Sequence, residues 1–97
     1  VRTVRAMKAA GADAVKLQTY TADTLTIDAS TPWFRIGAGT LWGGRTLHDL
    51  YAEASLPWEW HRELQAVAHD EGLDCFSTPF DASAVDFLES LGVPAYK

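Results

Sequence analysis

The sequence is short of cysteine, of basic residues and of long apolar runs. Its single cysteine, Cys75, has no partner for an internal disulfide, which favours a reducing, cytoplasmic setting. Eight Lys and Arg stand against 13 Asp and Glu, a formal charge of −5 that argues against binding a nucleic-acid backbone. No run approaches the ~18 apolar residues that a membrane helix needs. We therefore expect neither nucleic-acid nor membrane partners.

The composition is that of a folded protein. Of the 97 residues 47% are hydrophobic, and four are tryptophan, which argues against disorder. The sequence begins at Val1 inside a helical pattern and stops at Lys97 inside a strand-like one. We therefore expect residues 1–97 to be an incomplete part of one larger domain.

Apolar periodicity and turn residues predict helices that alternate with strands. The expected helices cover 1–10, 46–54, 57–71 and 82–91, and the expected strands cover 14–19, 73–77 and 93–97. We expect Val4, Met7 and Val85 to face the core, Asp81 to cap the last helix and Gly92 to end it. Residues 20–45 form a long irregular stretch, a length typical of a lid or binding loop.

This alternation predicts an α/β fold with a parallel sheet and right-handed crossovers. The residues leave two architectures open, a doubly wound sheet and a (β/α)8 barrel. No glycine-rich phosphate fingerprint follows the first or second strand, which weakens the dinucleotide-binding version of the former. A barrel needs about 250 residues, so this chain would supply less than half of one.

Two strand lysines are the strongest candidates for binding an anion. Lys16 and Gln18 share one face of the first strand because strand side chains alternate, and Val15 and Leu17 occupy the other face. An ammonium among apolar neighbours is costly unless it meets an anion, although an edge lysine facing water is the plainer interpretation. Lys97 follows an apolar run, so the same two interpretations, an anion-binding lysine or one that faces water, apply to it.

Two residues with hydroxyl groups lie at the C-terminal end of the second strand. In barrel enzymes the active site is built at the C-terminal ends of the strands. Ser77 and Thr78 could bind a phosphate oxygen there, or could belong to a turn that only terminates the strand.

The remaining chemically versatile side chains favour structural roles. His48, His61 and His69 fall on predicted helices at spacings unsuited to metal binding, and we expect them on solvated faces. Cys75 is expected to be a small core residue. The loop aromatics Trp33, Phe34 and Trp42 could stack on a sugar, but packing is the favoured role for most of them.

Several strings, in this order and spacing, together resemble the sialic acid synthase (N-acetylneuraminate synthase-like) family. They are residues 12–20 (ADAVKLQTY), 76–81 (FSTPFD), 85–88 (VDFL) and 93–97 (VPAYK). Residues 39–47 (GTLWGGRTL) and 56–61 (LPWEWH) resemble the pseudaminic acid synthase branch specifically.

The resemblance implies a partial (β/α)8 TIM barrel running from helix 1 through strand 4. It implies condensation of phosphoenolpyruvate with an N-acetylated amino sugar, here a 2,4-diacetamido-2,4,6-trideoxy hexose, in a homodimer. It places Lys16, Thr78 and Lys97 in the phosphoenolpyruvate site and Gln18 near the acceptor sugar. A divalent metal, manganese or magnesium, is implied, with its ligands and the catalytic residues outside these 97 residues, so the fragment alone is expected to be inactive.

Two other hypotheses stay open. The same chemistry could act on another acceptor and give N-acetylneuraminate or legionaminic acid. A different class would be a non-catalytic carbohydrate-binding module that uses Trp33 and Trp42.

Overall fold

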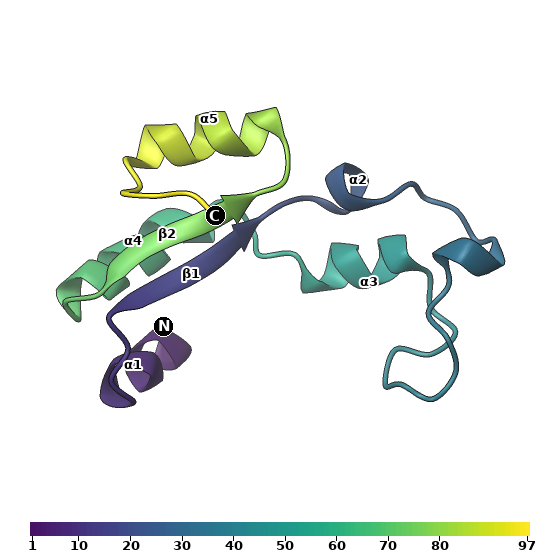
Figure 1. Cartoon of the computed structure of the whole chain (residues 1–97), viewed down its shortest axis with the longest axis horizontal. Helices are drawn as coiled ribbons and strands as arrows, with labels where there is room; N and C mark the ends of the chain where they lie inside the picture. Colours follow the sequence, from purple (N-terminus) through teal and green to yellow (C-terminus); the bar gives the residue numbers. More distant parts are fainter. The chain divides into compact units, whose positions relative to one another are not determined.

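The computed structural model describes all 97 residues, which form two compact units (Figure 1). Unit 1 comprises residues 1–19 and 56–97, and unit 2 comprises residues 20–55. None of the helices in either unit combines the length and apolarity needed to cross a bilayer.

Unit 1 is a mixed α/β structure around a parallel two-stranded sheet. Its elements, in chain order, are α1 (Arg2–Ala9), β1 (Ala14–Thr19), α4 (Trp60–Asp70), β2 (Asp74–Pro79) and α5 (Ala82–Leu91). β1 and β2 pair in parallel, from Ala14 opposite Asp74 to Thr19 opposite Pro79 (Figure 1). The predicted alternation and the parallel pairing are thus confirmed, and β1 has the predicted bounds.

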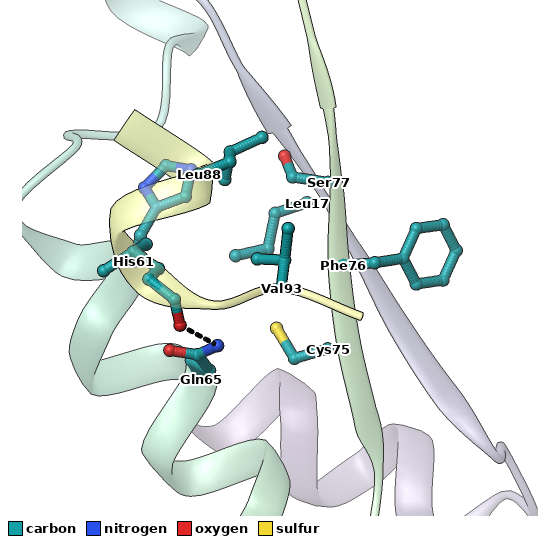
Figure 2. A pocket seen from close by; sticks show the side chains of 9 residues that line it. Leu17, His61, Gln65, Cys75, Phe76, Ser77, Leu88 and Val93 are labelled. Atoms are coloured by element: carbon teal, nitrogen blue, oxygen red, sulfur yellow. Dashed lines mark hydrogen bonds between the residues drawn. The ribbon is translucent and has the colours of Figure 1, made fainter. Parts of the chain in front are cut away.

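The two faces of this sheet differ in what they meet. We call one the core face, whose residues are Val15, Leu17, Thr19, Cys75 and Ser77. On it Val15 and Cys75 form a buried cluster with residues from α1, α4 and the segment before β2, namely Val4, Ala68 and Leu73. The open face carries the alternate residues Lys16, Gln18, Phe76 and Thr78. Figure 2 shows Phe76 pointing away from the core-face side chains of β2.

The ends of α5 follow from its sequence. The Asp81 carboxylate accepts hydrogen bonds from the backbone N–H groups of Ser83 and Ala84, as an N-cap does. Gly92 ends the helix at φ 65°, a left-handed conformation that favours glycine. Both predicted caps are confirmed.

The helix predicted from Pro57 begins three residues later, at Trp60. Residues 58 and 59 instead form a turn before the helix, in which the N–H of Trp60 bonds to the carbonyl of Pro57 and the N–H of His61 bonds to the carbonyl of Trp58. Their (i, i+3) spacing is tighter than the α-helical (i, i+4) spacing, so Pro57 precedes the helix rather than opening it.

The predicted strand 93–97 is present only as a single bridge. Tyr96 pairs in parallel with Ser77, and the N–H of Lys97 donates to the carbonyl of Ser77 at 3.1 Å. Pro94 has no N–H to give to a ladder, which limits the pairing to the last residues of the segment.

The apolar stripes of two helices are narrower than predicted. In α1 only Val4 is buried, and Met7 is 39% exposed. In α5 Ala84 and Leu88 are buried one turn apart, whereas Val85 is 38% exposed. Val85 lies about 100° around the helix from Ala84, outside the contact with the sheet. The predictions for Met7 and Val85 were wrong.

Unit 2 corresponds to the predicted irregular stretch and the helix after it. It contains α2 (Ala22–Leu25), a 3-10 turn (Pro32–Phe34) and α3 (Leu47–Ala54). The Thr46 hydroxyl accepts from the N–H of Asp49 and caps α3. Arg45 holds the loop through Glu53 at 2.7 Å and the carbonyl of Asp49 at 3.2 Å.

Candidate functional site

The strand register brings three of the four predicted site residues into one row on the open face. Gln18 of β1 lies opposite Thr78 of β2. Neighbouring strands are about 4.8 Å apart, so these side chains are adjacent. One residue beyond the Ser77–Tyr96 bridge, Lys97 lies level with Thr78 on its other side. The row therefore runs Gln18, Thr78, Lys97.

The orientation of Lys97 follows from its neighbour. The Tyr96 hydroxyl donates to the carboxylate of Glu89 on α5, so the tyrosine side chain points toward the helix. Side chains alternate along an extended segment, and Lys97 therefore belongs to the open face. Its side chain is exposed.

Lys16 completes the group on the same face. It lies opposite Phe76 and two residues before Gln18, about 6.6 Å along the strand. Its side chain and that of Gln18 are exposed, while Val15 beside it is buried, as the alternation predicted.

Thr78 has the one side-chain polar atom of the chain that is buried without a hydrogen-bond partner. Its Oγ1 has neither donor nor acceptor within reach. A buried hydroxyl without a partner costs about 1–3 kcal/mol, so native structures rarely leave one unless a ligand supplies the bond. Thr78 lies between Gln18 and Lys97 in the row.

The charges of this face favour an anion. The three ion pairs of the structure are Arg5–Glu71, Arg45–Glu53 and His48–Asp23, and neither Lys16 nor Lys97 takes part. Two ammonium groups without carboxylate partners and a free hydroxyl suit a small ligand with two anionic groups.

Sequence reasoning missed His61, which is buried and not on a solvated face. Its ring is 1% exposed, and Nε2 lies 2.8 Å from Oγ1 of Thr19. Thr19 Oγ1 in turn lies 2.7 Å from Oγ of Ser77. Burial lowers the pKa of His61. The spacing held a signal, because His61 is three residues before Leu64 and seven before Ala68, on the inward face of α4.

The other two histidines differ from each other. His69 is exposed, as predicted. His48 is only 20% exposed at its side chain and pairs with Asp23 at 2.8 Å. Its hydrogen bond to Asp23 raises the pKa of His48.

Cys75 occupies the core, as predicted. Its residue is 2% exposed, and burial raises the pKa of the thiol, so the nucleophilic thiolate is disfavoured.

The predicted packing role fails for one loop aromatic. Trp33 is 88% exposed, because the 3-10 turn that carries it has no buried residue. Trp42 is 43% exposed, with the guanidinium of Arg45 6.0 Å from its ring centre.

The side chains do not fit a metal centre. No three His, Cys, Asp or Glu residues come together anywhere in the 97 residues. The open-face group offers two ammonium groups, an amide and a hydroxyl, which are poor ligands for a divalent cation.

Comparison with known proteins agrees with the resemblance seen in the sequence. The model of the NeuB family matches residues 3–97. The chain is 44% identical over its 97 residues to a pseudaminic acid synthase of Campylobacter jejuni, and 46% identical over 95 residues to one of Helicobacter pylori. It is 36% identical over 94 residues to an N,N'-diacetyllegionaminic acid synthase of Legionella pneumophila.

The match covers nearly all of this chain but a minor part of each relative. The chain spans 28% of the two pseudaminic acid synthases and 26% of the legionaminic acid synthase. A family model that covers residues 3–97 leaves little of the sequence outside the match. The chain therefore belongs to the NeuB family.

Proposed function

We propose that this chain supplies the phosphoenolpyruvate-binding part of a nonulosonic acid synthase with a (β/α)8 barrel. The observation that carries the proposal is the unpartnered Thr78 hydroxyl, which lies in a row with Gln18 and Lys97 and near Lys16. Phosphoenolpyruvate has a carboxylate and a phosphate, which match two free ammonium groups and a hydroxyl donor. In this proposal residues 1–97 are the N-terminal part of the barrel domain.

The four proposed site residues, Lys16, Gln18, Thr78 and Lys97, then divide the binding of the two reactants between them. The ammonium groups of Lys16 and Lys97 bind the carboxylate and phosphate, and the Thr78 hydroxyl donates to a phosphate oxygen. Gln18, next to Thr78, offers an amide to the acceptor sugar. Holding both reactants at adjacent strands removes most of the entropic cost of bringing them together.

The proposed reaction is an aldol-like condensation. C3 of phosphoenolpyruvate adds to the aldehyde carbon of the open-chain sugar, water adds at C2, and phosphate leaves with cleavage of the carbon–oxygen bond. The four proposed site residues bind and orient, and none is a carboxylate or imidazole suited to proton transfer near neutral pH. We therefore expect the 97 residues alone to be inactive. The divalent metal implied for the family finds no matching set of side chains in residues 1–97.

The acceptor is proposed from the relatives. Two pseudaminic acid synthases more than 40% identical to the chain favour a 2,4-diacetamido-2,4,6-trideoxy hexose and a pseudaminic acid product. Legionaminic acid or N-acetylneuraminate is the alternative product. We also propose that the intact protein is cytoplasmic and homodimeric.

The test is phosphoenolpyruvate binding by the intact protein, measured by isothermal titration calorimetry. Lys16→Ala and Lys97→Ala should each weaken binding about 10- to 100-fold, because each removes a charged hydrogen bond worth about 1.5–3 kcal/mol. Lys8→Ala is the matched control, since Lys8 is exposed on α1 and bonds to the carbonyl of Gly72. Equal affinity in wild type, Lys16→Ala and Lys8→Ala would contradict the proposal.

A carbohydrate-binding module is the second candidate, favoured by the 88% exposure of Trp33. It predicts sugar binding that Trp33→Ala abolishes and Lys16→Ala leaves unchanged. Titration of the same variants with N-acetylated amino sugars separates the two functions.

A further inference from the structure

Three buried polar side chains join β1, β2 and α4 on the core face of the sheet. They are Thr19, Ser77 and His61, each at most 1% exposed, and we call them the buried triad. Oγ1 of Thr19 is the centre, 2.7 Å from Ser77 Oγ and 2.8 Å from His61 Nε2. Figure 2 shows His61 and Ser77 on the same side of β2, with Leu88 beside them.

The hydrogen bonds of the triad run in one consistent direction. Nδ1 of His61 lies 3.4 Å from the carbonyl oxygen of Pro57 and donates its proton there. Nε2 then accepts a hydrogen bond from the Thr19 hydroxyl, and Thr19 Oγ1 accepts one from the Ser77 hydroxyl. This arrangement needs a neutral imidazole, the form that burial favours.

A buried polar triad stabilises a core only if all of its hydrogen bonds are made. Apolar residues of the same shape could replace such a group at little cost, whereas a partly satisfied polar group is strongly unfavourable. The polar triad instead specifies how the elements are arranged, because its hydrogen bonds form in only one arrangement of the two strands and the helix. A slip of β1 by one residue would turn Thr19 to the open face and leave His61 without a partner.

The triad lies directly behind the proposed binding row. Thr19 follows Gln18 in β1, and Ser77 precedes Thr78 in β2, each pointing to the opposite face from its neighbour. The N–H of Phe80 bonds to the carbonyl of Thr19 at 3.2 Å, and the N–H of Lys97 bonds to the carbonyl of Ser77. The backbone atoms of the triad thus also hold the segments that follow.

We propose that Thr19, Ser77 and His61 are positioning residues that fix the ends of β1 and β2 so that Gln18, Thr78 and Lys97 meet one ligand. The link to phosphoenolpyruvate rests on the proposed function, whereas the fixing of the strand ends does not. None of the three side chains touches the ligand.

The experiment compares variants of the intact protein by amide hydrogen exchange and phosphoenolpyruvate titration. Thr19→Val removes the central hydroxyl at nearly constant shape, and Thr19→Ser restores it. Cys75→Ala is the matched control, because Cys75 is equally buried on the core face but bonds to neither Thr19 nor His61. It measures what loss of core packing alone does.

Thr19→Val should speed exchange at least tenfold over residues 16–20 and 76–80, with little change over 62–70, and weaken phosphoenolpyruvate binding about tenfold. Thr19→Ser should behave like wild type, and Cys75→Ala should change exchange evenly and leave affinity unaltered. If Thr19→Val does not fold, Ser77→Ala is the substitute, because it removes only the hydrogen bond between Ser77 and Thr19. It should speed exchange over the same residues and weaken phosphoenolpyruvate binding, each by about threefold.

The outcomes separate the two proposals. If Thr19→Val matches Cys75→Ala in exchange and in affinity, the positioning role is overturned. If wild type does not bind phosphoenolpyruvate but Thr19→Val still loosens only the strand ends, the proposed function fails and the fixing of the strand ends stands. Weaker binding without faster local exchange would also overturn the inference, because the triad would then not act through the strand ends.

Discussion

The two units of the chain are ordered by different forces. Unit 1 has a cluster of buried apolar residues under a parallel sheet and a buried, hydrogen-bonded polar triad on the same face of that sheet. Unit 2 buries only Tyr20 and Ala22 and relies on exposed polar contacts such as Arg45 to Glu53. Packed apolar contacts define one geometry, whereas exposed ion pairs contribute about 0–1 kcal/mol each. Unit 1 is therefore suited to hold the open-face row of Gln18, Thr78 and Lys97 in fixed register.

The largest difference should come from removing one leucine side chain in each unit. Leu88 of α5 is 1% exposed, and Leu41 of the unit 2 loop is 97% exposed. Leu88→Ala should lower the free energy of unfolding by about 2–5 kcal/mol, since it leaves a cavity, and Leu41→Ala should change it by less than about 0.5 kcal/mol. Chemical denaturation of both variants measures this, and equal midpoints would refute the contrast.

A smaller difference is expected between the two helix caps. The Asp81 carboxylate accepts two backbone N–H bonds and one from the Ser83 hydroxyl, whereas Thr46 accepts one. Asp81→Ala should cost about 1–2 kcal/mol and Thr46→Ala about 0.5–1 kcal/mol. Asp81→Asn, which keeps the cap, is the control for Asp81→Ala. Thermal unfolding would contradict this ordering if Thr46→Ala were the more damaging variant.

The smallest effect is the pH dependence of stability that His48 and His61 contribute. The two contributions should have opposite signs. Burial lowers the pKa of His61 below its ordinary 6.5, so the unfolded chain binds more protons there. Its contribution is complete above about pH 6.5 and is lost as the pH falls. The bond to Asp23 raises the pKa of His48, so its contribution is complete below about pH 6.5 and is lost as the pH rises through the folded pKa.

Titration of the ring protons by NMR distinguishes the two histidines. His48 should titrate above 6.5 and His61 below it, and Asp23→Asn should lower the midpoint of His48 alone. Coincident midpoints in the folded protein would show that burial and pairing do not separate the units in this way.

The sequence predicted what local patterns determine. The alternation around Lys16 placed β1 and its two faces, and Asp81 and Gly92 marked both ends of α5. These features depend on residues a few positions apart. The family resemblance named Gln18, Thr78 and Lys97 as site residues. It did not show that they lie in one row, because that depends on the register between strands.

The misses have a common physical cause. The spacing of His61 only indicates that it lies on the inward face of α4; its hydrogen-bond partner Thr19 is 42 residues before it, and no local pattern reveals such a partner. Trp33 is likewise exposed because little of the rest of the chain packs against it, and its local sequence does not reveal this. Short-range spacing indicates which face is apolar, and tertiary contacts decide which polar groups that face accepts.

The strict alternation of the two sheet faces has a consequence for how such a protein can change. Exposed open-face side chains such as Lys16 and Gln18 can be exchanged by substitution with little disturbance of the hydrophobic cluster behind them. A single inserted or deleted residue in β1 would instead turn its open-face side chains toward the core. Point mutations within the strands can therefore change the open face while the core stays intact, whereas a change of length is better tolerated in the loops that follow the strands.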